Sequence, residues 1–217
     1  MSESEQQNKV KTKRRELSQD KIVEAALRIL TTEDESALSM RRVAKECGVS
    51  AMALYHHVED KDQLAELAVD RIFHDVAMEM ADWQGGARAG ALHLMSTLRK
   101  RLIDVPGAGT IFVRRAIVAK GTALTTEAMF RSLNGCGLHG KALAQTADSF
   151  AMLLIGSIAN ELTRPARIRD GLIQQVPDTE TPILNENIEA YSDRDGAALF
   201  EQALGWIIDA ALKSQSA

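Results

Sequence analysis

The feature that most constrains this chain is a pair of short helix signals separated by a single glycine, in residues 39–61. Ser39 is a favourable N-cap, and apolar residues follow it at the spacing of one helical face. Gly48 predicts the end of this first helix, because glycine adopts the left-handed conformation that closes a helix without a Cβ clash. Ser50 is a second N-cap, so a second amphipathic helix is expected directly after the turn. The segment therefore predicts a helix-turn-helix.

The second helix of this pair is expected to have one buried and one solvent-facing side. Its buried side is predicted to contain Ala51, Leu54, Tyr55 and Val58, which recur at helical spacing. The opposite side contains Met52, Ala53, His56 and His57. Small and polar side chains of this kind suit a helix that enters a DNA major groove, with its N-terminal residues nearest the base edges.

The run GVSAMALYHHVEDKDQL, at residues 48–64, resembles the recognition-helix signature of the tetracycline-repressor (TetR) family. By position, the resemblance implies base contacts from Arg41, Ala51, Met52, Ala53 and His56, and phosphate contacts from Tyr55 and Lys61. His57 and the two caps, Ser39 and Ser50, belong to the same predicted surface. The small and apolar residues offer no side-chain hydrogen bond, so base recognition would depend on Arg41, His56 and apolar contacts with thymine methyl groups.

The sequence predicts an all-α protein, because it has only 4 prolines, many helix formers and no sustained apolar alternation. The resemblance implies an N-terminal three-helix DNA-binding head and a C-terminal helical domain for ligand binding and dimerisation. We expect a basic arm at residues 1–16, the helix-turn-helix domain at residues 17–62 and the ligand-binding and dimerisation domain at residues 63–217.

The distribution of charge fits this division. Residues 1–61 contain equal numbers of basic and acidic residues, so the net charge of -4 arises in residues 62–217. Basic residues gather near the N-terminus, at Lys9, Lys11, Lys13, Arg14 and Arg15. Local positive charge favours phosphate binding. Two interpretations stay open for this segment, namely a solvated tail and an arm that contacts the DNA backbone or minor groove.

Several features favour a cytoplasmic protein with no membrane partner. Cys47 and Cys136 are too few and too isolated for a disulfide framework, which fits a reducing compartment. Residues 1–16 are polar and lack the apolar centre of a signal peptide. The longest apolar run, at residues 150–159, is too short to span a bilayer.

Further helices are predicted throughout the chain. They cover residues 18–31, 60–82, 87–105, 110–120, 122–133, 138–162 and 196–213, with a break at 106–109 and a loop-rich connection, containing at most one short helix, at 164–195. The helices at 138–162 and 196–213 have more apolar surface than one core stripe requires. A two-fold homodimer through these two helices would bury that surface and resembles the family's arrangement. The alternative is that both helices pack within one subunit.

The segment GCGLHGKA, at residues 135–142, matches GxGxxG and most of a phosphate-binding GxxxxGK loop. Either loop should follow a strand, but a helix is predicted before it, and Ala142 occupies the position that needs a Ser or Thr hydroxyl for magnesium. We therefore interpret the segment as a glycine-closed turn between helices.

No metal or cofactor is expected. None of the histidines has a glutamate three residues before it, the spacing of helical di-iron sites. In tetracycline repressors a histidine late in the fourth helix binds the drug and another binds its magnesium ion. Ala77 aligns with the drug-binding position, so a magnesium-bridged tetracycline is not expected.

The resemblance implies a small-molecule pocket among the fifth to eighth helices. The candidate side chains are His93, Met95, Phe112, Met129, Phe130, Phe150 and Asn160, which would combine apolar walls with a few polar groups. The favoured function is a ligand-responsive transcriptional regulator, usually a repressor in this family, without catalysis, that binds a palindromic double-stranded DNA operator as a dimer. The alternatives are a small-molecule sequestering protein and, less favoured, a nucleotide-binding helical enzyme.

Overall fold

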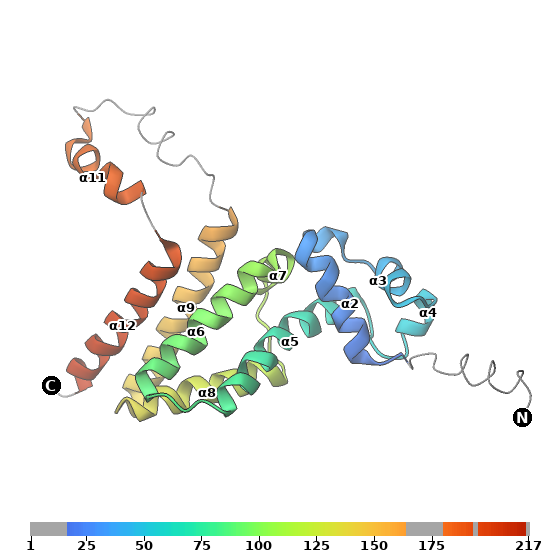
Figure 1. Cartoon of the computed structure of the whole chain (residues 1–217), viewed down its shortest axis with the longest axis horizontal. Coiled ribbons are helices and arrows are strands. Elements are labelled where there is room, and N and C mark those ends of the chain that lie inside the picture. The colour runs from blue at the N-terminus through green and yellow to red at the C-terminus, as the bar shows by residue number, and fades with distance from the viewer. Residues whose placement is uncertain (1–16, 164–179, 193–194, 216–217) are drawn as a thin grey trace, which may run out of the picture.

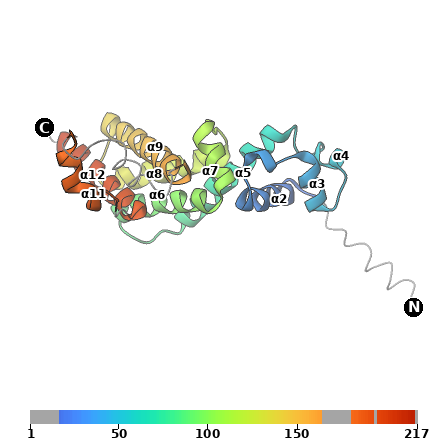
Figure 2. The ribbon, with the colours of Figure 1, turned by 90° about the horizontal axis from the view of Figure 1, so that it is seen from above.

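The computed structural model describes residues 17–163, 180–192 and 195–215. In those ranges all regular elements are helices, as predicted. Figure 1 shows a small N-terminal unit at one end of an elongated molecule and a larger helical body at the other, and Figure 2 shows the same separation from above. The predicted basic arm, residues 1–16, lies outside the described residues, as does much of the predicted loop-rich connection.

The N-terminal unit, called the head below, contains α2 (Gln19–Thr32), the short 3-10 helix η1 (Glu35–Ala37), α3 (Met40–Cys47) and α4 (Ala51–Leu54). Ser18 begins α2 as predicted, since its hydroxyl accepts a hydrogen bond from the Lys21 N–H. The core of the head consists of fully buried side chains from all three α-helices, including Ile22, Leu30, Val43 and Leu54. This packing makes one compact support for the short helix α4.

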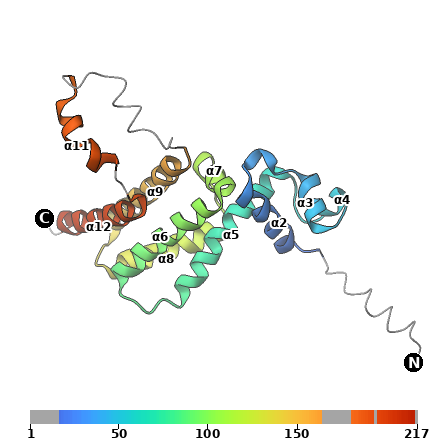
Figure 3. The ribbon, with the colours of Figure 1, turned by 45° about the horizontal axis from the view of Figure 1, so that its top comes forward.

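The helix α5 (Lys61–Ala81) connects the head with the body (Figure 3). Its N-cap is Asp60, whose carboxylate accepts a hydrogen bond from the Gln63 N–H at 2.8 Å, as the sequence predicted. The helix packs on α2 of the head and on α6 and α8 of the body. The domain boundary expected after residue 62 thus falls in the first turn of a helix that both parts share, and it stays a prediction.

The body contains α6 (Ala87–Asp104), α7 (Pro106–Arg114), α8 (Lys120–Gly135), α9 (Gly140–Thr163), α11 (Pro182–Ser192) and α12 (Gly196–Gln215). Two predicted boundaries were wrong. The expected break at residues 106–109 is the first turn of α7, because proline fits the first helical position, where no N–H partner is needed. The same helix ends at Arg114 rather than near residue 120, and Arg115 is already extended.

The head contacts the body at α7 as well as through α5. A Cβ atom on Gly107 would lie 2.8 Å from the Glu33 carbonyl oxygen, so the start of α7 presses directly on the end of α2. At the other end of α7, the Arg115 guanidinium donates hydrogen bonds to Glu35 at 2.8 Å and to Asp62 at 3.1 Å. These carboxylates, Asp62 foremost, raise the pKa of Arg115. Arg115 therefore ties the body to both η1 and the first turn of α5.

Among the described residues, α9 is long and apolar enough to cross a membrane by length and composition alone, with a mean hydropathy of 1.4. The helix extends well beyond the apolar run at residues 150–159 that the sequence argument considered. It packs against α6, α7, α8 and α12, and it buries Leu143, Phe150, Leu154 and Ile158 in the body. The core helix of a helical protein meets the same test of length and composition.

Candidate nucleic-acid interface

Both helices of the helix-turn-helix begin, and the first of them ends, at the residues from which the motif was predicted. The Ser39 hydroxyl accepts a hydrogen bond from the Arg42 N–H, which begins α3. Gly48 is left-handed, with φ 69° and ψ 32°, and its N–H bonds to the carbonyls at the end of α3. The Ser50 hydroxyl accepts from the Ala53 N–H and begins α4. These local signals confirm the predicted turn and its two caps.

The second helix of the motif is shorter than predicted. The sequence suggested helical structure to Val58, but α4 ends at Leu54 and residues 55–57 form a turn. The His57 N–H bonds to the Leu54 carbonyl, three residues back, which tightens the chain after α4. The His57 carbonyl then accepts a hydrogen bond from the Gln19 amide, 3.0 Å away on α2. The turn is therefore held by Leu54 and Val58 below it and by Gln19 beside it.

Tyr55 was wrongly predicted to lie on the buried side. Because α4 ends before it, Tyr55 departs from the line of Leu54 and Val58, and its side chain is 50% exposed. Met52 is 72% exposed and His56 is also exposed. Ala51, Ala53 and His57 are partly buried. Met52, Tyr55 and His56 thus stand out from a support that Leu54 and Val58 anchor, and we call these three residues the α4 surface.

Arg41 and Arg42 are neighbours with different surroundings. The Arg42 guanidinium donates two hydrogen bonds to the Glu33 carboxylate, one of them at 2.7 Å. This pairing holds the pKa of Glu33 below its ordinary value. Arg41 is exposed, and within the described part of the chain its side chain has no ion pair or hydrogen bond. Of the two, Arg41 is the one whose donors are available to a ligand.

Lys61 lies in a different setting from the α4 surface. It is partly buried in the first turn of α5 and lines an open depression with a volume of about 600 Å³. The depression lies where the head meets α7, and its other lining residues are Asp34, Glu35, Ser36, Thr110, Arg114 and Thr163. Lys61 therefore has acidic neighbours from η1 and its cap as well as Arg114 from the body.

The predicted ligand-binding residues do not gather at one place. Met95, Met129 and Phe150 are buried in the core. Phe112 packs on Phe73 of α5, with ring centroids 5.3 Å apart. His93 is exposed and stacks on Trp83, at 4.8 Å between centroids, and Asn160 is exposed on α9. Phe130 differs from the others because it lines a depression beside α8.

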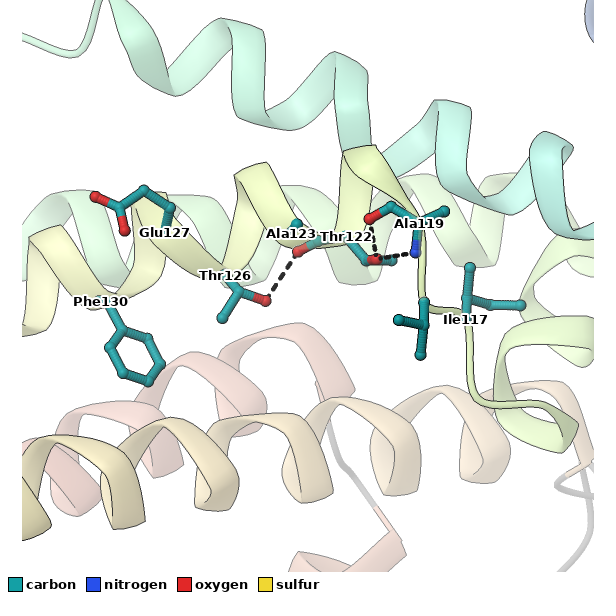
Figure 4. A pocket seen from close by; sticks show the side chains of 8 residues that line it. Ile117, Ala119, Thr122, Ala123, Thr126, Glu127 and Phe130 are labelled. Carbon is teal, nitrogen blue, oxygen red and sulfur yellow. Dashed lines mark hydrogen bonds between the residues drawn. The ribbon is translucent and has the colours of Figure 1, made fainter.

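This depression, which we call the α8 groove, has a volume of about 540 Å³ (Figure 4). Its lining residues are Ile117, Val118, Ala119, Thr122, Ala123, Thr126, Glu127 and Phe130. Apart from Phe130, none of them is among the predicted ligand-binding residues, which are aromatic, methionine, histidine and asparagine side chains. The available signal was the small and hydroxyl-bearing series at residues 119, 122, 123 and 126, which recurs at helical spacing along one side of α8.

The α8 groove adjoins a direct link to α5. Both oxygens of the Asp70 carboxylate accept hydrogen bonds from the start of α8, from the Gly121 N–H and the Thr122 N–H, each at 2.9 Å. The Thr125 hydroxyl donates to the Phe73 carbonyl at 2.8 Å. A Cβ atom on Gly121 would lie 2.2 Å from the Asp70 carbonyl oxygen, so only glycine allows this approach. Asp70 thus caps a body helix from the helix that also supports the head.

The segment GCGLHGKA forms the turn between α8 and α9 that the sequence predicted. Gly137 and Gly140 have positive φ angles of 96° and 52°, and Leu138 between them is buried. A helix precedes the segment, not a strand. Gln215, near the end of α12, holds the turn by accepting from the His139 N–H and donating to the Gly137 carbonyl. The backbone is therefore arranged as a helix connection and not as a phosphate-binding loop.

The helices α9 and α12 pack on each other and leave apolar side chains uncovered. Their inner sides bury Phe150, Leu154, Ile158, Phe200, Leu204 and Ile208. Met152 and Ile155 of α9, and Leu199 and Trp206 of α12, are exposed, with Trp206 at 59%. We call these four residues the α9–α12 face. Ion pairs join both helices to α6, from Arg99 to Glu161 and from Arg88 to Asp209, and Arg88 lowers the pKa of Asp209.

The comparisons with known proteins agree with this arrangement. Residues 22–68 match the family model for "Bacterial regulatory proteins, tetR family". An HTH-type transcriptional regulator of Saccharopolyspora erythraea is 29% identical over 67% of this chain and 61% of its own length. The HTH-type transcriptional repressor DrrR1 of Streptomyces coeruleorubidus is 40% identical over 37% of this chain and 29% of its length. The chain thus spans less than two thirds of either curated relative.

A solved structure extends the likeness to almost the whole chain. The Streptomyces coelicolor TetR family protein ActR, in complex with (S)-DNPA, superposes with a TM-score of 0.78 at 28% identity. The match covers 91% of this chain and 98% of that one. It therefore includes the helical body as well as the head.

Proposed function

Because this chain belongs to the tetR family of bacterial regulatory proteins, we propose that it is a ligand-responsive, DNA-binding transcriptional regulator of the repressor kind. The observation that carries the proposal is the α4 surface, in which Met52, Tyr55 and His56 face solvent from a turn anchored by the buried Leu54. A short, rigidly supported helix with an exposed outer side is what recognition in a major groove requires. The proposed place of action is the cytoplasm.

The two classes of DNA contact have different proposed residues. Arg41 and His56 have hydrogen-bonding groups that can discriminate base edges. The Arg41 side chain has no ion pair among residues 17–163, 180–192 and 195–215, which supports this role. Met52, with Ala51 and Ala53, can make apolar contacts with thymine methyl groups. Tyr55 and Lys61 are proposed to bind phosphates, which positions the head without reading sequence. Arg42 is left out, because Glu33 occupies its guanidinium.

The two classes predict different results in quantitative footprinting on a selected operator. Lys61→Ala should weaken binding to all sequences alike and reduce the slope of log affinity against log salt by about one. Arg41→Ala and His56→Ala should instead relax base preference, by about 1–3 kcal/mol at the contacted positions. Arg42→Ala is the matched control and should leave base preference unchanged. A uniform loss of affinity for His56→Ala would contradict its role as a base reader.

We propose that the active form is a homodimer, joined through α9 and α12. Support comes from the α9–α12 face, which exposes two large side chains on each helix beside a well-packed inner side. Two copies related by a two-fold axis would bury this face in a four-helix bundle. The two heads would then meet half-sites of a palindrome roughly 34–36 Å apart, or a multiple of that distance.

We further propose that a small-molecule effector acts through the α8 groove. ActR has been crystallised with the small molecule (S)-DNPA, and the groove of this chain lies on the same helix start that Asp70 caps. A ligand that displaces the first turn of α8 would strain the two hydrogen bonds to Asp70 and so shift α5. It can change operator affinity only by its difference in affinity between the two states.

A double-mutant cycle tests Asp70 as the coupling residue, with a bulky side chain in place of the unknown effector. Thr126→Trp, which fills the groove, should lower operator affinity about tenfold, within the usual range of allosteric coupling. In an Asp70→Asn background the same substitution should have little effect. Asp75→Asn is the control, since Asp75 pairs with Arg71 on α5 itself. An equal effect of Thr126→Trp in all three backgrounds, measured by fluorescence anisotropy, would exclude coupling through Asp70.

A further inference from the structure

We propose that the α8 groove selects an aromatic molecule that carries a protonated amine and rejects a carboxylate of the same size. This statement names the ligand class of the effector site and so rests on the proposed function. It follows from the hydrogen-bonding groups of the groove that are not already used within the protein.

Four backbone donors at the start of α8 are already used, those of Ala119, Gly121, Thr122 and Ala123. The N–H groups of Gly121 and Thr122 bind the Asp70 carboxylate. The Ala123 N–H bonds to the Ala119 carbonyl at 3.1 Å, and the Ala119 N–H bonds to the Thr122 hydroxyl at 3.0 Å. A free helix N-terminus attracts anions through such donors. Here a carboxylate from α5 already occupies the position that an anionic ligand would take.

The side-chain hydroxyls of the groove are also committed as donors. The Thr122 hydroxyl donates to the Ala119 carbonyl, and the Thr126 hydroxyl donates to the Thr122 carbonyl, both at 2.8 Å (Figure 4). A hydroxyl has one hydrogen and two lone pairs, so each of these groups can only accept a further hydrogen bond. They call for a donor on the ligand.

The charged residue that lines the groove is Glu127, and it is acidic. Its carboxylate accepts from Arg131 one turn further along α8, at 3.2 Å, with both side chains largely exposed. An exposed pair of this kind contributes little and is easily exchanged. A ligand ammonium can therefore pair with Glu127 in the place of Arg131, whereas a ligand carboxylate would lie against the Glu127 carboxylate and the lone pairs of the threonine hydroxyls.

The walls of the groove determine the rest of the ligand. Apolar surface is supplied by Ile117, Val118 and Phe130. Val118 is 94% exposed, so a ligand that covers it removes apolar surface from water, which favours binding. The Phe130 ring points away from α5 in Figure 4 and offers an aromatic face to a ring or to a cation. A volume of about 540 Å³ lies within the range of pockets for small organic ligands.

Two probes with the same ring system test the selection. 1-Naphthylmethylamine and 1-naphthoate are titrated at pH 7 into the full chain with labelled threonine and isoleucine methyl groups, and the NMR signals are followed. We expect the amine to shift the signals of Ile117, Thr122 and Thr126. It should bind about fivefold more tightly than the acid, which is the contribution of the stronger exposed ion pairs. Glu127→Gln should remove this discrimination, and Thr126→Val should weaken the amine. Glu201→Gln, on α12, is the control and should retain the preference for the amine over the acid.

Equal or tighter binding of naphthoate, or shifts that bypass the groove methyl groups, would overturn the proposal. Discrimination that persists in Glu127→Gln would do the same. Operator binding by the unmodified chain is measured in parallel. If that binding were absent while the amine still bound in the groove, the DNA-binding role would fail and the ligand selection would stand.

Discussion

Trp206→Glu is expected to convert the proposed dimer into monomers and to lower operator affinity by about a thousandfold or more. Trp206 is 59% exposed and is the more exposed of the two α12 residues in the α9–α12 face. In a two-fold interface each substitution occurs twice, so two carboxylates would be buried without partners. A monomer retains one head and therefore loses the second half-site, which brings affinity toward the non-specific level. Sedimentation velocity and footprinting on the same samples measure the two effects.

Met78→Glu provides the matched control for this substitution. Met78 is also an exposed apolar residue, but it lies on α5, outside the proposed interface. The variant should stay dimeric and bind the operator normally. If Trp206→Glu remained a dimer at micromolar concentration, α9 and α12 would serve only the core of one subunit, which is the alternative that the sequence left open.

Leu54→Ala is expected to abolish specific operator binding while the body stays folded and dimeric. Leu54 is the buried residue of α4 and is fully enclosed by the head. Truncation of a buried leucine to alanine typically costs about 2–5 kcal/mol, and a head of three short helices has little stability to spare. Amide hydrogen exchange should show the loss as faster exchange in α3 and α4 with unchanged protection in α9 and α12.

Leu54→Met separates the packing effect from any direct role in DNA binding. The two side chains have similar volumes, and such exchanges usually cost less than about 1.5 kcal/mol. Leu54→Met should therefore bind the operator nearly as the natural chain does. Normal operator affinity of Leu54→Ala would contradict the view that this one side chain anchors the recognition element.

The helix-turn-helix was predictable because its signals act over a few residues. The hydroxyls of Ser39 and Ser50 accept hydrogen bonds from N–H groups in the first turn of the helix that each begins. Gly48 adopts the left-handed conformation that ends α3. The helices of the body and the turn at residues 135–142 could be predicted for the same reason. Local caps, glycine and helical spacing do not depend on what the rest of the chain does.

The parts that the sequence did not reveal depend on distant contacts. The end of α4 and the exposure of Tyr55 accompany a hydrogen bond from Gln19 to His57, 38 positions apart. Asp70 caps α8 across 51 positions, and nothing near Asp70 in the sequence indicates that role. The ligand candidates were selected by side-chain type, and most of them simply pack in the core or lie apart on the surface. Periodicity identifies a buried side but not the neighbour that covers it.

The contacts of α7 with the head limit how this chain can be recombined with its relatives. A chimera cut after residue 62 would receive a foreign partner for the Arg115 guanidinium in place of Glu35 and Asp62, and a foreign helix end against Gly107. A chimera that exchanges DNA-binding specificity between relatives should therefore keep Glu35, Asp62, Gly107 and Arg115 together from one parent. Without those carboxylates, Arg115 would no longer join the end of α7 to the transplanted head.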